Sequence, residues 1–394
     1  MRLVRGKVWS PFSADGLLRW RTWPLMCLRS LQLVVSLCLA ALGCAAPPAI
    51  STAPAGPPTS IPAASSAPPI AVPSRAVPPA REARRALIDQ ISAILRERYL
   101  EPEVAERMIE SLHQHWQNGD YDAADDSSLA KLVRAELRAV SHDEHLGLYY
   151  GAGGARPPAG PAAGGPGPAE PVQSGLGGAG GARRFGFGSS QRLSGNVAVL
   201  PLFGFVPANE EAVQAGIADC LTEVADAAAL IIDLRENNGG RVPTFALIIS
   251  YFLDGPPMLL SRVERRYDHS SYEVWTRADV KGTRFGGKKP LYVLTSARTF
   301  SGGEGLAFYL QRLGRAKVVG ETTRGGAHPP EMIELGNDFR LAVPVAKATY
   351  SAAHGTWEGV GVIPDVPVAA DQALQEAHRR ALDELARSSG HSAG

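Results

Sequence analysis

The sequence predicts an α/β fold in its C-terminal half, preceded by helices, and three observations support this prediction. From residue 195 onward, apolar β-type runs alternate with stretches of helical spacing, a pattern typical of a largely parallel sheet. Residues 83–140 show helical spacing only, and two Pro-, Ala- or Gly-rich segments interrupt the chain. We therefore expect a signal peptide (1–44), a tether (45–82), an N-terminal helical domain (83–150), a linker (151–184), a core (185–386) and a tail (387–394).

The helical domain and the core have separate element patterns. In the first, Leu87, Ile91 and Leu95 mark one helix, which ends before Pro102. Further helices are expected at 102–117 and 128–140, and together the three predict a small bundle. The core is expected to have strands at 197–203, 230–234, 291–294 and 317–320, and helices at 209–224, 243–253 and 304–313.

The N-terminus has the form of a targeting segment. The run 31–42 is apolar but too short to span a bilayer comfortably, and Gly43-Cys44 follows it. Cys44 is a candidate lipidation site, which would anchor the protein to a membrane. An ordinary signal peptide cut nearby is the alternative, and either Met1 or Met26 is the start. Both alternatives predict export to the periplasm or cell envelope, with residues 45–82 as an extended tether.

Composition narrows the classes of partner. The formal net charge is +1, so a nucleic-acid partner is not suggested. The cysteines and histidines do not show the spacing of a zinc site. We expect neither a metal nor an organic cofactor.

Ser301 is the first candidate site residue. It follows the apolar run 291–294 and precedes two glycines and a helix-compatible stretch. A turn of this kind exposes a nucleophilic hydroxyl next to the free N–H groups of a helix start, which suit an oxyanion. The same pattern also fits an ordinary helix N-cap.

Four blocks in sequence order carry a family resemblance. The segment 291–328 and the stretches 229–240, 318–328 and 357–365 resemble the tail-specific (C-terminal-processing) serine peptidases. The similarity is to the tricorn-like and interphotoreceptor-retinoid-binding-protein-like branch, which residues 88–150 also resemble. It implies a crotonase-like ββα core with a small N-terminal helical bundle. The linker leaves no room for the PDZ domain that many of these peptidases carry.

The resemblance also implies roles for individual residues. Ser301 would be the nucleophile, and the lysine base of the C-terminal-processing branch falls on Gly326, so a Ser–Lys dyad is not expected. His145 matches the Asp-x-His pattern of the tricorn-like branch and would be the base, although Glu144 stands where that branch has serine. His142, after Ser141, is the alternative register.

Two further roles complete the implied site. Glu358, before Gly-Val-x-Pro-Asp, would orient the histidine and stabilise its imidazolium. The amide of Gly302 would form the oxyanion hole together with that of Gly239 or Gly240.

Two functions from different classes follow. The first is a serine endopeptidase that cleaves peptide or protein substrates through an acyl-enzyme on Ser301. The second is a non-catalytic carrier of hydrophobic ligands on the same fold. Retention of Ser301, His145 and Glu358 together favours the enzyme.

Overall fold

The computed structural model describes residues 80–151, 184–208, 211–350 and 355–391. All of them belong to the compact unit Ser74–Gly394. The expected signal peptide, Met26, Cys44, nearly all of the tether and nearly all of the linker lie outside the described residues. Among the helices described, none has the length and apolar character needed to cross a membrane.

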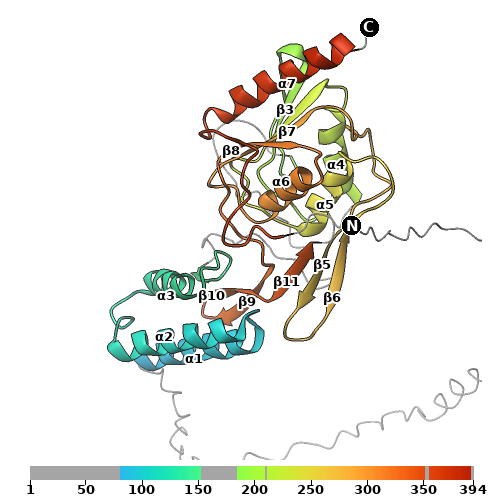
Figure 1. The fold of residues 1–394 in the computed structure, drawn as a ribbon. Coiled ribbons are helices and arrows are strands. Elements are labelled where there is room, and N and C mark those ends of the chain that lie inside the picture. The colour runs from blue at the N-terminus through green and yellow to red at the C-terminus, as the bar shows by residue number, and fades with distance from the viewer. Residues whose placement is uncertain (1–79, 152–183, 209–210, 351–354, 392–394) are drawn as a thin grey trace, which may run out of the picture. The chain divides into compact units, whose positions relative to one another are not determined.

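A six-stranded sheet forms the centre of the C-terminal half (Figure 1). Its strand order is β12-β8-β7-β4-β3-β2, and every pairing is parallel except that of β2 with β3. The mixed α/β class predicted from the alternating pattern is confirmed. The strands are β2 (Gln191–Leu193), β3 (Val197–Pro201), β4 (Ala229–Asp233), β7 (Leu291–Thr295), β8 (Lys317–Gly320) and β12 (Val366–Pro367), with a short 3₁₀ turn η1 (Ser194–Asn196) between β2 and β3.

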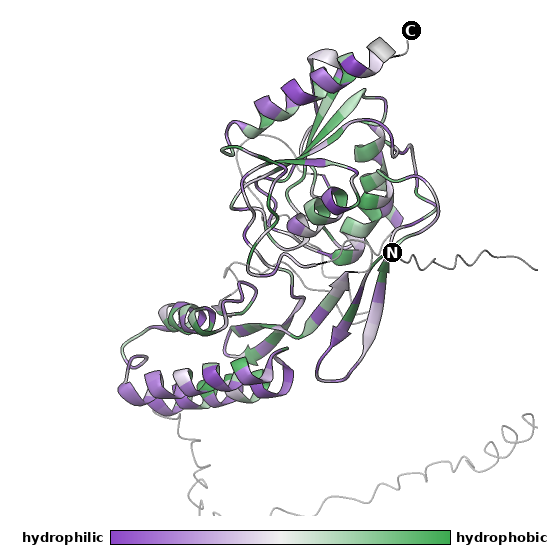
Figure 2. Ribbon diagram, in the orientation of Figure 1, coloured by the Kyte–Doolittle hydropathy of each residue, from purple (hydrophilic) through white to green (hydrophobic). Residues whose placement is uncertain are grey.

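Helices cover both faces of this sheet. Because successive strand residues point to opposite faces, Val199 and Ile231 pack with helix α7 (Ala373–His391), while Leu200 and Ile232 belong to the larger core on the other side. That core includes residues of α4 (Glu211–Thr222), α5 (Val242–Ser250) and α6 (Gly302–Arg312). Figure 2 shows hydrophobic colour on the sheet and α5, and mostly hydrophilic colour on α7.

The N-terminal helices pack with strands from the other end of the chain. Helices α1 (Ala80–Arg98), α2 (Pro102–Asn118) and α3 (Asp126–Ser141) contact one another in sequence order. Strand β1 (Gly147–Tyr150) packs against α3 and pairs antiparallel with β10 (Phe339–Pro344), which pairs in turn with β9 (Pro330–Gly336). Residues more than 180 positions apart therefore share one three-stranded sheet (Figure 1).

A second antiparallel sheet has the order β11-β5-β6. It consists of β5 (Leu259–Arg265), β6 (Ser271–Trp275) and β11 (Ala346–Tyr350). The sequence patterns predicted no element for these strands, nor for β9, β10 and α7. Charged residues interrupt the apolar pattern, as Arg262 and Glu264 do in β5, so the strands lack the continuous apolar run of the central sheet. Helix α7 also continues across the expected boundary at 386.

The site lies where neighbouring parallel strands end. Asp233 of β4 is in register with Leu294 of β7, so the loops that follow these two strands leave the same edge of the sheet. These loops carry residues 234–241 and 296–301, and the second leads directly into α6. The carboxyl edge of a parallel sheet is the usual place for a ligand site in α/β folds.

Candidate active site

Ser301 stands immediately before α6 in a strained conformation. Its φ of 55° and ψ of −118° lie outside the regions that L-residues normally adopt, and an ordinary N-cap has an extended backbone with negative φ. Strain of this kind costs roughly 1–3 kcal/mol and persists where the surroundings enforce it. The Ser301 amide donates to the carboxylate of Glu304 at 2.6 Å, which helps to hold the turn.

His145 is the histidine that the structure brings to Ser301. Its Nε2 lies 2.9 Å from the Ser301 Oγ, across 156 positions of sequence. The residue lies between α3 and β1, is only 2% exposed, and its ring centroid is 4.5 Å from that of Phe300. Burial lowers the pKa of His145 to about 4, so the ring is neutral at neutral pH and can accept a proton.

The alternative histidine has a different place. His142 is the C-cap of α3, with a left-handed backbone (φ 58°), and its side chain is exposed. Ser141 accepts a hydrogen bond from the Asp143 amide at 3.1 Å. These observations favour the register that places His145 at the nucleophile.

Gly326 explains sterically why histidine and lysine would not share this site. A Cβ built on Gly326 would lie 2.3 Å from Phe300 Cε2 and 2.8 Å from His145 Cε1. Both distances are shorter than real contacts allow. A side chain at this position would therefore displace the ring that contacts Ser301.

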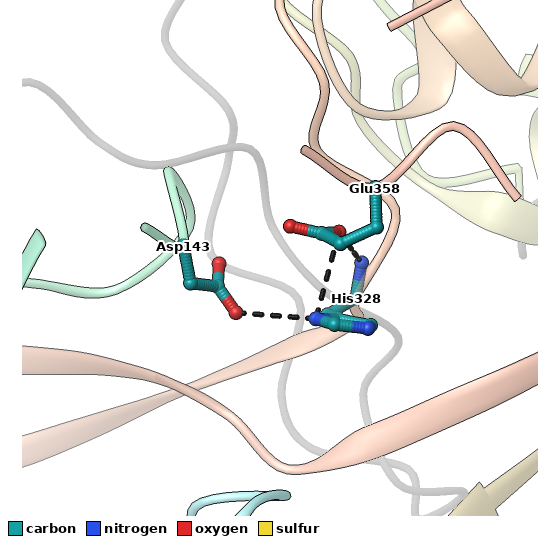
Figure 3. Close-up of side chains that lie close together, drawn as sticks. All are labelled: Asp143, His328 and Glu358. Atoms are coloured by element: carbon teal, nitrogen blue, oxygen red, sulfur yellow. Dashed lines mark hydrogen bonds and ion pairs between the residues drawn. The ribbon is translucent and has the colours of Figure 1, made fainter. Parts of the chain in front are cut away.

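Glu358 lies with a second histidine, as Figure 3 shows. Its Oε2 accepts hydrogen bonds from the amides of Ala327 and His328, and lies 3.5 Å from the His328 Nδ1. The same Nδ1 is 3.2 Å from the Oδ2 of Asp143. The His145 Nδ1 is buried with no hydrogen-bond partner among the described residues. The structure thus brings Glu358 to His328 rather than to His145.

The group Asp143, His328 and Glu358 has the composition of a metal site, and its ligand atoms lie within 4.8 Å of one another. A carboxylate oxygen offers about two lone pairs. The two backbone amides already occupy those of the Glu358 Oε2. The two carboxylates raise the pKa of His328 against the effect of its burial, while burial and the charge of Asp143 raise the pKa of Glu358 to about 7.

The glycines expected at the oxyanion hole lie against the nucleophile turn. The Gly239 amide donates to Asn237 Oδ1 at 2.8 Å, and a Cβ on Gly239 would come within 2.7 Å of the Ser301 Cβ. A Cβ on Gly302 would lie 3.3 Å from the Gly240 nitrogen. Gly302 is the first residue of α6, where amides have no partner inside the helix. Because the Gly239 amide is engaged, Gly240 is the better partner for Gly302.

Glu304 is a site residue to which the sequence assigned no role. It is fully buried and accepts from the amides of Ser301, Gly325 and Gly326 and from the Thr323 hydroxyl, at 2.6 to 2.9 Å. Burial raises its pKa to about 7, although these donors favour the charged form. A glutamate three residues after a serine is a capping-box signature, which could have identified this contact.

A small cavity opens beside Ser301. Its volume is about 40 Å³, enough for a few water-sized spheres at roughly 10–15 Å³ each. Ser301, Gly302 and His328 form part of its wall. Its other walls are mostly apolar and include Val242, Phe245, Val263, Tyr309, Tyr350 and Trp357.

Two family models match the chain. The model of peptidase family S41 matches residues 196–368, and the model of the N-terminal domain of peptidase S41 in eukaryotic IRBP matches residues 73–169. Together they cover the N-terminal helices and the six-stranded sheet except its edge strand β2. The chain therefore belongs to peptidase family S41.

Individual relatives agree with this assignment. The chain is 34% identical over 141 residues to carboxyl-terminal-processing peptidase 2, chloroplastic, of Arabidopsis thaliana, an alignment that covers 36% of this chain and 26% of the relative. It is 32% identical over 135 residues to a carboxyl-terminal-processing protease of a Picosynechococcus species, covering 34% and 30%. The chain thus spans less than a third of the length of these curated relatives.

One solved structure has a similar fold over most of both chains. It is a candidate peptidase from Parabacteroides merdae, with a TM-score of 0.52 and 18% identity. The match covers 76% of this chain and 96% of that one. At this identity the comparison supports the fold alone.

Proposed function

We propose that this chain is a serine endopeptidase of the tail-specific, tricorn-like type. The observation that carries the proposal is the 2.9 Å contact between the His145 Nε2 and the Ser301 Oγ. A nucleophile needs its base within hydrogen-bond reach, and here the base is buried and neutral. Family membership and the carboxyl-terminal-processing relatives support the same activity.

The reaction proceeds through two steps. The Ser301 Oγ attacks the peptide carbonyl carbon while the His145 Nε2 takes its proton, and the amides of Gly302 and Gly240 donate to the oxyanion. His145 then protonates the leaving amine, and the acyl-enzyme forms. Water hydrolyses the ester with His145 again acting as the base. Glu358 is the acidic residue that we retain in the site, and its contacts are with the amide and the Nδ1 of His328.

The cavity beside Ser301 supports a neutral, apolar substrate side chain next to the scissile bond. Apart from His328, no residue that lines it carries a charge. Its volume of about 40 Å³ is far below the roughly 300–1,000 Å³ of a site that encloses a small-molecule ligand. This difference argues against the carrier, which no comparison supports.

The architecture proposed for the chain is a crotonase-like ββα core with a small N-terminal helical bundle. The six-stranded sheet flanked by α4–α7 supports the first part, and the mutual packing of α1, α2 and α3 supports the second. The division at residues 151–184 is supported by their composition. Because β1 follows the helical bundle and pairs with β10 of the C-terminal half, a shared sheet connects these two parts of the chain in addition to the linker.

We propose further that the protein is exported, with lipid on Cys44 as the means of attachment to a membrane. The support is the apolar run 31–42, the Gly43-Cys44 step and the Pro/Ala-rich segment that follows. Detergent partitioning of the wild type and Cys44→Ser tests the anchor. Recovery of both proteins in the aqueous phase would leave only a cleavable signal peptide.

A fluorophosphonate probe tests the enzymatic proposal directly, because it reacts only with an activated serine. We expect mass spectrometry to find one adduct, on Ser301. The adduct should be absent from Ser301→Ala and unchanged in Ser389→Ala, which alters an exposed serine of α7. A folded wild-type protein that takes up no probe would contradict the proposed function.

A further inference from the structure

The cluster of Asp143, His328 and Glu358 has no role in the scheme above beyond the acid expected at Glu358. In a Ser-His-acid site the acid usually holds the histidine Nδ1. Here that atom of His145 has no partner among the described residues, and Glu358 contacts the amide and the Nδ1 of His328 instead. Another group must fix the base.

Asp143 contacts both histidines. One oxygen, Oδ1, accepts from the His145 amide at 3.0 Å, and the other, Oδ2, lies 3.2 Å from the His328 Nδ1 (Figure 3). The residue is 3% exposed, so its charge acts through a medium that screens it weakly. Because both oxygens are engaged, the carboxylate has little freedom to rotate.

We propose that Asp143 is the positioning carboxylate of His145, and that His328 and Glu358 hold Asp143 in this role. Glu358 accepts from the His328 amide and lies 3.5 Å from the His328 Nδ1, and the same Nδ1 holds the Asp143 Oδ2 at 3.2 Å. The second histidine thus sets the electrostatic environment of the first. This inference rests on the proposed function of Ser301 and His145.

Asp143 and His328 have opposite effects on the protonation of His145. The charge of Asp143 favours the protonated form of His145, whereas the positive charge of His328 disfavours it. Arg138 and Arg324 also face His145 and disfavour its protonation. On the side of His328, the facing carboxylates are Asp143, Glu358 and Glu101. Tyr99 of the neighbouring segment lies close to Asp143, and burial keeps its phenol protonated at neutral pH.

The test measures the protonation of His145 in Asp143→Asn and His328→Gln, using the full chain. The rate of fluorophosphonate inactivation between about pH 3.5 and 8 gives the acid limb, and ¹⁵N-histidine NMR gives the same titration without catalysis. We expect the limb to move to lower pH in Asp143→Asn and to higher pH in His328→Gln. The plateau rate should fall on the order of a hundredfold in Asp143→Asn, since a misplaced base costs about that much.

Two further variants control the experiment. Glu334→Gln removes an exposed carboxylate of β9 and should leave the limb unchanged, while His145→Asn identifies the His145 signal among those of the nine histidines. The proposal would be overturned if the acid limb stayed unchanged in folded Asp143→Asn and folded His328→Gln, or if it moved in the same direction in both variants. If Asp143→Asn does not fold, His328→Gln alone decides. Absence of a Ser301 adduct in the wild type would refute the enzymatic function. The NMR titration would still show whether Asp143 and His328 control the protonation of His145.

Discussion

The two loops that meet at Ser301 each carry a histidine, one fully buried and one partly buried, and the pKa values of the two rings shift in opposite directions. In the loop between α3 and β1, desolvation dominates at His145 and lowers its pKa to about 4. In the loop before β9, desolvation also acts on His328, but the hydrogen bond to Asp143 and the charges of Glu358 and Asp143 outweigh it and raise the pKa. Burial alone therefore does not decide the state of a histidine.

The difference assigns separate tasks to the two rings. A neutral ring with a free lone pair can take a proton from a hydroxyl, whereas the two carboxylates beside His328 favour its protonated form, which can only donate. Pairs of titratable groups with divergent environments are typical of acid–base sites. We therefore assign proton transfer to His145 and charge balance to His328.

The largest expected effect tests whether the contact of the neutral histidine with Ser301 serves catalysis. Ser301→Ala removes the nucleophile and should lower kcat on the order of a million-fold, as in other Ser-His-acid sites. Peptide cleavage and circular dichroism measure activity and fold in the same preparation. Cleavage at the parental rate by a folded variant would show that another residue attacks the substrate.

The next largest loss of activity distinguishes His145, in the loop after α3, from His142, at the C-terminal end of α3. His145→Asn should cost nearly as much as Ser301→Ala, because nucleophile and base act as a unit. His142→Asn should have little effect, since asparagine tolerates the left-handed C-cap conformation and the side chain is exposed. Side-by-side kcat/KM values measure both, and the reverse ranking would restore the alternative register.

A smaller loss of kcat is expected from a substitution at Gly326, which packs against the ring of His145. Gly326→Ala places a methyl group 2.3 Å from the Phe300 Cε2 and 2.8 Å from the His145 Cε1, and should push this pair of rings from Ser301, with a loss of about a hundredfold in kcat. Gly314→Asn is the matched control, because a Cβ there meets nothing within 4 Å and asparagine tolerates its φ of 65°. If Gly326→Ala retained the parental kcat, the close packing around His145 would have no catalytic importance.

The smallest effect is on stability. A depressed folded-state pKa means that the unfolded chain binds the proton more readily, so the contribution of His145 is present above about pH 6.5 and is lost as pH falls toward 4. The loss amounts to roughly 3 kcal/mol, at about 1.4 kcal/mol per pKa unit. The raised pKa of His328 has the opposite sign, so its contribution is present below about pH 6.5 and is lost as pH rises through its folded value.

Thermal unfolding of the wild type and His145→Asn at pH 7 and pH 4 measures the first of these terms. The wild type should lose more stability on acidification than the variant, because the variant has no buried imidazole to protonate. Equal losses in the two proteins would mean that His145 titrates normally in the folded state.

The sequence predicted the four central strands of the six-stranded sheet but missed its edge strands β2 and β12 and both three-stranded antiparallel sheets. Strands such as 230–234 and 291–294 are buried on both faces and read as apolar runs, whereas β9 and β11 alternate exposed and buried residues over short lengths. Their pairing depends on partners far away in the chain, as β1 with β10 shows. Strand pairing over such distances leaves no pattern in the local sequence from which the strands could be predicted.

At the site, local motifs predicted the residues better than their partners. The Ser301 turn and the Asp-x-His motif lie where the contact forms, because each is a short segment with its own backbone geometry. The carboxylate at 358 was expected to meet His145, and the structure places it at His328 instead. Which of the two histidines Glu358 contacts depends on the packing of three separate loops, and spacing along the chain cannot report it.

The pairing of β1 with β10 has a consequence for the order of events during synthesis. The ribosome completes His145 and then Ser301 before it has made β10, which holds the loop of the base through β1. At 5–20 residues per second, the stretch from residue 301 to residue 344 takes roughly 2 to 9 seconds. The emerging polypeptide thus carries both side chains before the strand that pairs with β1 exists, so formation of the contact between Ser301 and His145 has to wait for the synthesis of β10.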